Sequence, residues 1–367
     1  MTRMLAQGLA TRPEHQVEVT LVTQTPAGEM DDRTHPFQII RQPNALKLFA
    51  LIKAADVLHV ANPAFLPLLF AWLLGRPFVI EHHGYQAACP NGLLLYTPDQ
   101  TVCSGHFMAG RYAKCLTCNS KELGKGGSAR LLALTFPRRW LARRATYNIA
   151  PSHHVSRRVS LPRTEVIRHG VHNPRSNSGS SLAPGGRSPI SFAYVGRLVA
   201  EKGVPVLLRA ADRLRKKGYA FRIKILGDGP LRGALEDMAR DLDLADRVDF
   251  VGAVPVECAA DLLSGVMAVV VPSVWEEVAP LVPAEQLMFG NLVIASDLGG
   301  LSEIVGNYGL KFPAGDAEAL ASCMESVISN GVGLTEMRMR ARVHALDVYS
   351  EDRMIEKHAS LYRSLVR

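Results

Sequence analysis

Residues 272–290 read PSVWEEVAPLVPAEQLMFG and place two glutamates, Glu277 and Glu285, eight positions apart. On one continuous helix they would be offset by about 80°, because each residue turns about 100°. Glu277, however, precedes the apolar-periodic part of the segment and is predicted to lie in a loop. Glu285 is predicted to lie in a helix that ends at Gly290, a residue suited to a C-terminal cap. The loop and the helix start therefore offer carboxylates for sugar or ribose hydroxyls and N–H groups for phosphate.

On both sides of this segment, short apolar strands alternate with helices. After residue 189, strands are expected at 190–195, 221–226, 248–251, 268–271 and 292–295. Before residue 173, they are expected at 17–23, 56–62, 77–80, 147–152 and 166–171. Such alternation predicts α/β domains whose parallel sheets carry helices on both faces. Most strands of the second series end in Gly, Pro or Ser, where ligands bind in open α/β sheets.

The chain of 367 residues is long enough for two domains, and its 47% hydrophobic and 21% charged residues exclude a disordered chain. A Ser, Gly and Pro-rich stretch, NPRSNSGSSLAPGGRSP, has no hydrophobic period and marks the domain boundary. We expect domains at 1–173 and 190–348, a linker at 174–189 and a final helix within 349–367. The most apolar run, 65–74, is too short for a membrane-spanning helix.

Four further motifs accompany the glutamate pair in a fixed order: YVGRLVAEKG (194–203), ILGDGP (225–230), RVDFVG (247–252) and SDLGGLSEIV (296–305). Together the five segments resemble the second half of retaining glycosyltransferases of family 4, the glycosyl transferases group 1. The resemblance implies the GT-B fold, in which two Rossmann-like domains face each other and a C-terminal helix crosses back to the first domain.

The resemblance also implies roles for charged side chains in the donor domain. Arg197 and Lys202 would grip the nucleotide diphosphate, and fixed cations there would stabilise the charge of the departing group. Glu277 would contact the donor sugar, and Glu285 the ribose hydroxyls. Arg197, Lys202 and Glu277 are thus expected to act in catalysis.

Further site residues follow from the same resemblance. His83 follows a strand and precedes Gly84, where family members commonly place a histidine against the donor sugar. His83 is therefore a candidate catalytic residue, although a lone histidine also occurs in purely structural roles. Gly227, Leu281 and Glu303 are candidate donor-binding residues.

The activity implied is transfer of a sugar from a nucleotide diphosphate sugar to an acceptor hydroxyl with retention of the anomeric configuration. The acceptor would be a glycan or a lipid-linked molecule in cell-surface polysaccharide or glycolipid assembly. No cofactor or metal is expected to be required for catalysis. Two alternatives are a non-catalytic nucleotide-sugar-binding or scaffold protein and a nucleotide-sugar epimerase on the same fold.

The beginning of the chain departs from the family pattern. Residues 1–10, MTRMLAQGLA, match the helix that normally follows the first strand and its Gly-rich loop. That strand and loop are therefore expected to be absent, which favours the scaffold alternative.

Four cysteines, Cys89, Cys103, Cys115 and Cys118, lie within an expected insertion at about 85–128. Their spacing, C-x13-C-x11-C-x2-C, includes the close pair typical of a tetrahedral structural zinc site. Free buried thiols and a redox or iron–sulfur centre are the alternatives.

Basic residues are concentrated in the first half of the chain, with 13 Lys and Arg against 2 Asp and Glu in residues 111–168. Here Arg138, Arg139, Arg143 and Arg144 are interleaved with Phe136, Trp140 and Leu141. The pattern favours a helix lying on an anionic membrane, and the alternative is a solvated basic face. Nucleic acid is a poorer match. We therefore expect a cytoplasmic protein that attaches peripherally to the inner face of the cell membrane.

Overall fold

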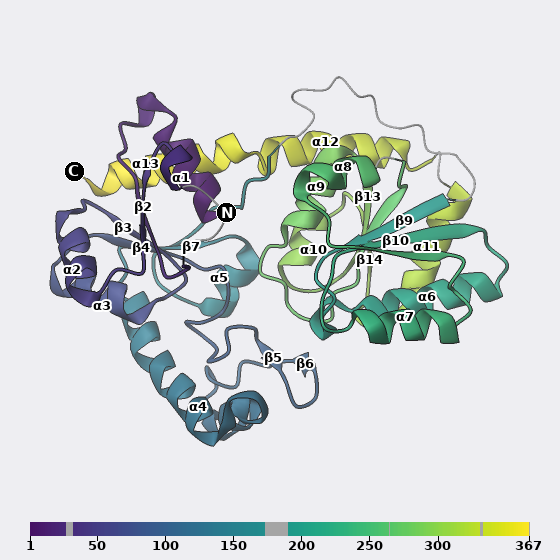
Figure 1. Ribbon diagram of the computed structural model, residues 1–367, viewed down its shortest axis with the longest axis horizontal. Coiled ribbons are helices and arrows are strands. Elements are labelled where there is room, and N and C mark those ends of the chain that lie inside the picture. Colours follow the sequence, from purple (N-terminus) through teal and green to yellow (C-terminus); the bar gives the residue numbers. More distant parts are fainter. Residues whose placement is uncertain (27–31, 173–189, 264, 331–332, 367) are drawn as a thin grey trace. The chain divides into compact units, whose positions relative to one another are not determined.

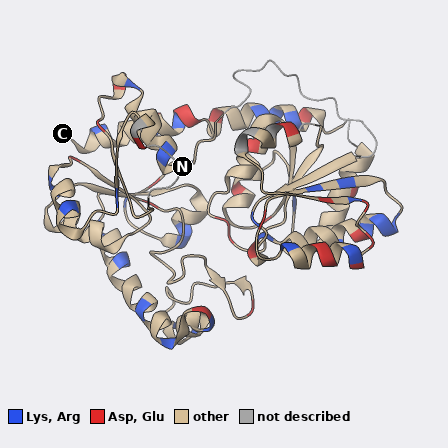
Figure 2. Ribbon diagram, viewed as in Figure 1, with Lys and Arg blue, Asp and Glu red and all other residues tan. Residues whose placement is uncertain are grey.

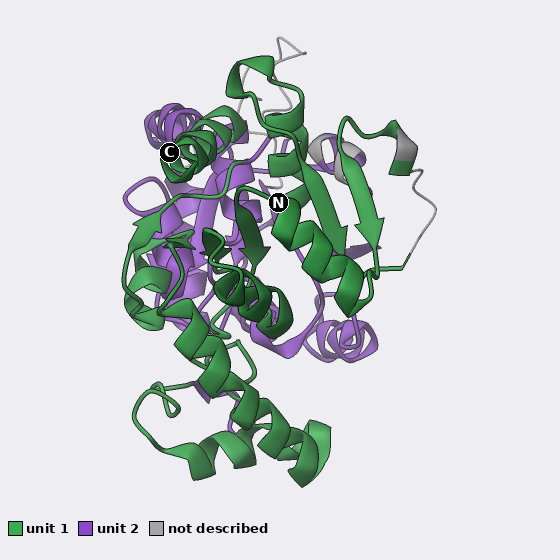
Figure 3. Cartoon of the chain, turned by 90° about the vertical axis from the view of Figure 1, so that its left-hand side faces the viewer, with its two compact units in different colours: residues 1–98, 103–170, 349–367 green, residues 99–102, 171–348 purple. Residues whose placement is uncertain are grey.

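The computed structural model describes residues 1–26, 32–172, 190–263, 265–330 and 333–366. The linker predicted at 174–189 lies outside the described residues. The chain divides into two compact units, which Figure 3 draws in two colours. Unit 1 comprises residues 1–98, 103–170 and 349–367, and unit 2 comprises residues 99–102 and 171–348.

Unit 2 is built on a six-stranded parallel sheet in the order β11-β10-β9-β12-β13-β14 (Figure 1). The strands are β9 (Ile190–Val195), β10 (Phe221–Leu226), β11 (Val248–Gly252), β12 (Ala268–Val271), β13 (Leu292–Ser296) and β14 (Leu310–Phe312). Counted along the chain, this is the order 3-2-1-4-5-6 of the doubly wound dinucleotide-binding fold. The order reverses between β9 and β12, so a ligand crevice is expected at the carboxyl ends of these two strands.

Helices connect the strands of unit 2: η4 (Ala200–Lys202), α6 (Val204–Lys216), α7 (Arg232–Asp241), α8 (Val256–Leu262), α9 (Leu281–Phe289), α10 (Gly299–Val305), α11 (Ala317–Asn330) and α12 (Thr335–Val348). The central strand β12 reads AVVV and is buried along its whole length, as expected for a parallel strand covered on both faces. Leu207 of α6, Val270 of β12 and Leu320 of α11 pack in one core.

Unit 1 contains a four-stranded parallel sheet, β3-β4-β7-β8, and a separate parallel pair, β1-β2. Its strands are β1 (Thr20–Thr23), β2 (Gln38–Arg41), β3 (Leu58–Ala61), β4 (Phe78–Glu81), β5 (Leu95–Tyr96), β7 (Tyr147–Ala150) and β8 (Thr164–Val166). The short strand β6 (Thr101–Val102) falls in residues 99–102, which are assigned to unit 2. Its helices are α1 (Thr2–Ala10), α2 (Ala45–Ala54), α3 (Phe65–Leu73), α4 (Tyr112–Ala142), α5 (His153–Val159) and α13 (Glu351–Leu365), with 3-10 turns at Pro13–His15 and Asp32–Thr34.

The last helix, α13, belongs to the core of unit 1. Met354 and Ile355 of α13 pack in one cluster with Leu5 of α1, Val79 of β4 and Ile149 of β7. The side chain of Ser350 caps the helix by accepting a hydrogen bond from the backbone N–H of Arg353 at 3.4 Å. Burial of the apolar face therefore fixes α13 on the sheet that the first part of the chain forms.

Several sequence predictions were wrong in detail. The strand predicted at 17–23 begins only at Thr20, and that at 166–171 ends at Val166. His153 and His154 open helix α5, because the side chain of Ser152 accepts from the backbone N–H of Val155 and caps it. Cys258 is exposed and Cys323 is half-buried.

Helix α3 lies in the most apolar run of the sequence, but only one of its faces is covered. Leu68 and Ala71 are fully buried, whereas Trp72 is 42% exposed and Leu73 is 61% exposed. In the described part of the chain, no helix combines the length and the apolar character needed to cross a membrane.

Candidate active site and metal centres

The reversal point of the sheet in unit 2 carries an ion pair between two predicted site residues. Lys202 ends the turn η4 that follows β9, and Glu277 lies in the loop that follows β12. The Nζ of Lys202 lies 2.6 Å from the Oε1 of Glu277, which also accepts from the hydroxyl of Ser273 at 2.7 Å. The carboxylate is buried, and the lysine side chain is 20% exposed. A single cation at the crevice thus holds a buried carboxylate and still reaches solvent.

Arg197 and Gly227 follow the ends of β9 and β10. The Arg197 side chain is 71% exposed and approaches Glu201 at 3.6 Å, so little fixes its position. Its backbone carbonyl accepts from the Tyr194 hydroxyl at 2.8 Å. Gly227 has a φ of +135°, and a Cβ there would overlap with the carbonyl oxygen of Gly196. Only glycine allows the two strand ends to approach this closely.

The remaining predicted donor residues lie on two helices. Glu285 is half-buried in α9, which ends at the left-handed Gly290 as predicted. Burial raises the pKa of the Glu285 carboxyl. Leu281 is the first residue of α9, and Glu303 lies in α10. Glu277 and Glu285 therefore come from a loop and a helix, as the sequence predicted.

His83 lies just beyond β4 in unit 1. Its Nε2 is 3.4 Å from the Oε2 of Glu81, and its ring stacks on that of His169 with centroids 5.0 Å apart. The neighbouring His82 is fully buried and pairs instead with the Oδ1 of Asn148 at 3.0 Å. Burial lowers the pKa of His82 to about 4. The two histidines therefore have different partners, and His83 is the one with an exposed fraction.

The four predicted zinc ligands, Cys89, Cys103, Cys115 and Cys118, are buried and line one small cavity of about 10 Å³. Burial raises the pKa of Cys89 to about 11 and that of Cys115 to about 12, so a metal would have to displace their protons. Among the described residues, three-ligand groups within 4.8 Å form around Glu81 and not among these sulfurs. The four cysteines share a cavity without converging, and zinc at this position stays a prediction.

The basic segment forms α4, along which Lys and Arg recur (Figure 2). Leu141 is buried, whereas Trp140 is 40% exposed and meets Trp72 of α3 edge to face at 5.0 Å. The Arg144 guanidinium lies 3.6 Å from the centre of the Trp140 ring. Arg139 is a structural residue, since it donates to the backbone carbonyls of Ala87, Val159 and Ser160.

Sequence reasoning missed the most densely packed polar cluster. Glu81 is 1% exposed, and imidazoles of His59, His83, His169 and His358 surround it. The sequence EHHG at the end of β4 indicated one member of the cluster, His83. No sequence spacing connects residue 81 with residues 59, 169 and 358, which meet only through the fold.

Comparison with known proteins gives a family match within unit 2. Residues 186–345 match the family model of glycosyl transferases group 1. A 178-residue stretch is 30% identical to alpha-D-kanosaminyltransferase of Streptomyces kanamyceticus, covering 47% of this chain and 45% of that protein. A 164-residue stretch is 31% identical to the putative colanic acid biosynthesis glycosyltransferase WcaL of Salmonella typhimurium, covering 43% of this chain and 40% of that protein. The chain thus spans less than half the length of the curated relatives that it matches.

Solved structures match over the whole chain. The Rickettsia africae glycosyltransferase superposes with a TM-score of 0.74 at 16% identity, over 100% of this chain and 94% of that one. Anabaena HepE, solved with UDP and glucose, gives a TM-score of 0.70 at 16% identity, over 99% and 95%. These matches confirm the predicted α/β fold class of two Rossmann-like domains. Residues 186–345 therefore match the family model of glycosyl transferases group 1, within a chain that has the fold of solved glycosyltransferases.

Proposed function

We propose that the protein is a retaining glycosyltransferase that moves a sugar from a nucleotide diphosphate sugar to an acceptor hydroxyl. The observation that carries this proposal is the Lys202–Glu277 pair at the reversal point of the sheet, inside a glycosyl transferases group 1 domain. A ligand crevice is expected at this point of a doubly wound sheet. The pair places one cation and one carboxylate there.

In this proposal the diphosphate competes with Glu277 for Lys202. The ammonium turns to the phosphate oxygens, and the exposed Arg197 adds a second cation. As the bond between the sugar and the diphosphate breaks, these cations stabilise the negative charge that grows on the leaving group. Glu277 is then free to accept hydrogen bonds from the sugar hydroxyls, while Ser273 still holds the carboxylate in place.

Glu285, Leu281, Gly227 and Glu303 complete the proposed donor site. The Glu285 carboxyl would bind the ribose hydroxyls, and the backbone near Leu281 and Gly227 would approach the sugar and the phosphates. In unit 1, His83 would contact the donor sugar. The acceptor is proposed to be a glycan or a lipid-linked molecule in cell-surface polysaccharide or glycolipid assembly, as the name of the colanic acid relative suggests.

The test is turnover with a panel of UDP-, GDP- and ADP-sugars, measured as nucleotide release and as transfer to sugar and lipid-linked acceptors. UDP-glucose comes first, because HepE was solved with UDP and glucose. We expect one donor to give a product with the donor's anomeric configuration in the NMR spectrum. An epimerised donor would establish the epimerase alternative, and nucleotide binding without release for any acceptor would establish the scaffold alternative.

We further propose that α3 and α4 dock on an anionic membrane. Trp72, Leu73, Phe136 and Trp140 are exposed by 40–61%, and Arg143 and Arg144 flank them. Tryptophan suits the headgroup region, and each nearby basic residue contributes about 1 kcal/mol to attachment.

Flotation with anionic and neutral vesicles tests whether these helices bind a membrane. Arg143→Glu with Arg144→Glu should abolish binding to anionic vesicles, whereas Arg240→Glu on α7 should leave it intact. Binding that ignores lipid charge would contradict the proposal.

A further inference from the structure

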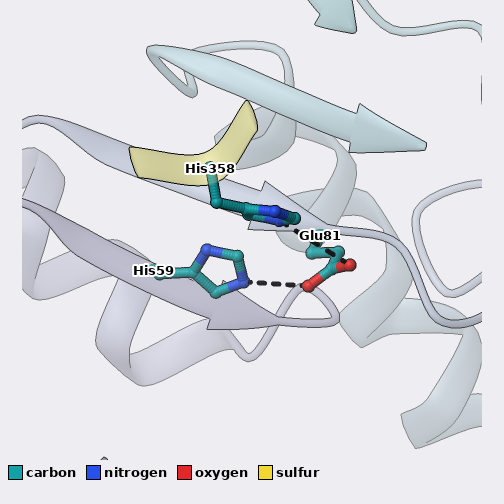
Figure 4. Close-up of side chains that lie close together, drawn as sticks. All are labelled: His59, Glu81 and His358. Atoms are coloured by element: carbon teal, nitrogen blue, oxygen red, sulfur yellow. Dashed lines mark ion pairs between the residues drawn. The ribbon is translucent and has the colours of Figure 1, made fainter. Parts of the chain in front are cut away.

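Glu81 lies at the centre of a buried cluster in which His83 alone has a part in the proposed transfer reaction. The Oε2 of Glu81 is 3.2 Å from the Nε2 of His59 on β3, and its Oε1 is 4.0 Å from the Nε2 of His358 on α13 (Figure 4). The ligand atoms of these three residues all lie within 4.8 Å of one another. On the other side, the stacked rings of His83 and His169 each approach the same carboxylate at 3.4 Å.

These polar atoms lack hydrogen-bond partners although they are buried. Both oxygens of Glu81 and the Nε2 atoms of the four histidines are close together, but none has hydrogen-bond geometry. Each unsatisfied buried polar group costs about 1–3 kcal/mol, so native structures rarely leave several in one place. Glu81 is 1% exposed and faces four imidazoles, so a cation among them would satisfy several of these atoms at once.

The hydrogen bond made by the His358 ring indicates what kind of group can lie between its Nε2 and Glu81. Its Nδ1 lies 2.8 Å from the carbonyl oxygen of Met354, which can only accept, so Nδ1 carries the proton. In this tautomer the Nε2 of His358 presents a lone pair toward the Oε1 of Glu81, 4.0 Å away. A cation between the two acceptors would satisfy both.

His59 has the outer partner that metal-bound histidines usually have. Its Nδ1 lies 2.6 Å from the hydroxyl of Tyr362, one turn after His358 on α13. Such hydrogen bonds orient imidazole ligands and set their tautomer. Two imidazoles and one carboxylate form a donor set typical of zinc.

We propose that His59, Glu81 and His358 bind one zinc ion. Zinc bonds of about 2.0–2.2 Å to nitrogen and oxygen place tetrahedral ligands roughly 3.3–3.6 Å apart. The separations from Glu81 are 3.2 Å to His59 and 4.0 Å to His358, so His358 would move closer when the ion binds. The ion would join strands β3 and β4 to helix α13, so a residue near the end of the chain would be fixed to the first sheet. The metal would stabilise unit 1 and would take no part in glycosyl transfer.

The experiment measures zinc on the full chain after dialysis against a chelator and titration with Zn²⁺. X-ray absorption distinguishes this site from the cysteines, because zinc lies about 2.0–2.1 Å from nitrogen or oxygen and about 2.3 Å from sulfur. We expect a shell of nitrogen and oxygen neighbours. His59→Gln and His358→Gln should each weaken that binding more than about 100-fold, since even the loss of an outer partner costs about 10–100-fold.

Two further variants complete the test. Tyr362→Phe should weaken zinc binding about 10–100-fold in a folded protein, so it answers the question even if His358→Gln fails to fold. His82→Gln removes an equally buried histidine next to the cluster and should leave zinc binding unchanged. Zinc bound by sulfur alone, or zinc affinity unchanged in Tyr362→Phe and the ligand variants, would overturn the proposal. So would a wild-type chain that takes up no zinc.

Discussion

The ion pair of Lys202 and Glu277 links stability to ligand binding. With Lys202 removed, the buried Glu277 keeps only the Ser273 hydroxyl, so part of its desolvation cost is no longer offset. The same change removes a cation from the proposed diphosphate site. A charge-assisted hydrogen bond contributes about 1.5–3 kcal/mol.

Lys202→Met is therefore expected to weaken UDP binding roughly 10- to 150-fold, as measured by calorimetry. Adding Glu277→Gln should restore stability without restoring UDP affinity, because it removes the buried charge but supplies no cation. Unchanged UDP affinity in Lys202→Met would show that the lysine serves the fold alone.

Glu285 gives a prediction about pH. Burial raises its pKa in the folded state above the usual value of 4.5, so the folded protein keeps this proton longer than the unfolded chain does. Stability should therefore fall as the pH rises from about 4.5 through the folded pKa. Glu285→Gln cannot ionise, so its Tm should exceed that of the wild type at pH 7 and approach it near pH 4. A constant difference in Tm at all pH values would show that the carboxyl does not titrate there.

The donor residues could be predicted from sequence because each lies within a few positions of a strand end. Parallel strands bring their carboxyl ends to one edge, so Lys202 and Glu277 meet even though 74 residues separate them in the chain. The cluster around Glu81 could not be predicted in this way. His358 reaches it only because the apolar face of α13 packs on unit 1, and a histidine within a helix has no sequence signal that names its partner.

The segments that follow β9 and β12 come into close contact at Gly203. Gly203 ends η4 and starts α6 with a φ of +70°, and a Cβ there would overlap with the carbonyl oxygen of Pro272. The backbone N–H of Val274 donates to the carbonyl of Glu201 at 3.0 Å and closes the same contact. This approach of two backbones sets the distance across which Lys202 reaches Glu277.

Gly203→Ala is expected to lower the free energy of unfolding by about 2–4 kcal/mol and to weaken UDP binding, because the loop after β12 must move. Gly218→Ala is the matched control. Gly218 has a similar φ of +81° but open space around it, so it should lose only about 1 kcal/mol and keep its UDP affinity. If the two variants lose the same free energy of unfolding, the whole effect comes from backbone strain and not from the contact with Pro272.

Elements were easier to predict than their ends. The strands β9, β10 and β12 appear where the sequence predicted them, because their apolar residues either follow one another, as in AVVV of β12, or alternate with charged ones, as in FRIKIL of β10. The separate pair β1-β2 is mostly exposed or half-buried, and there the alternation of residues 17–23 extends beyond the actual pairing. Pairing with a neighbour, which the sequence does not show, decides where such a strand begins.

The two units have separate cores, although the chain leaves unit 1 after residue 170 and returns to it at residue 349. Ile355 is fully buried in the core of unit 1, and Leu320 is fully buried in that of unit 2. Truncating either side chain to alanine should cost about 2–5 kcal/mol. If each core is cooperative by itself, the loss should be confined to the unit that carries the substitution.

Native-state hydrogen exchange measures this directly. Ile355→Ala should accelerate exchange at the amides of β4 and β7 and leave those of β9 and β12 unchanged, even though residue 355 follows all of unit 2 in the chain. Leu320→Ala should give the reverse pattern and serves as the matched control. Equal acceleration in both units for either variant would mean that the chain unfolds as one block. In that case the stability of the site around Lys202 would depend on α13 as much as on the sheet of unit 2.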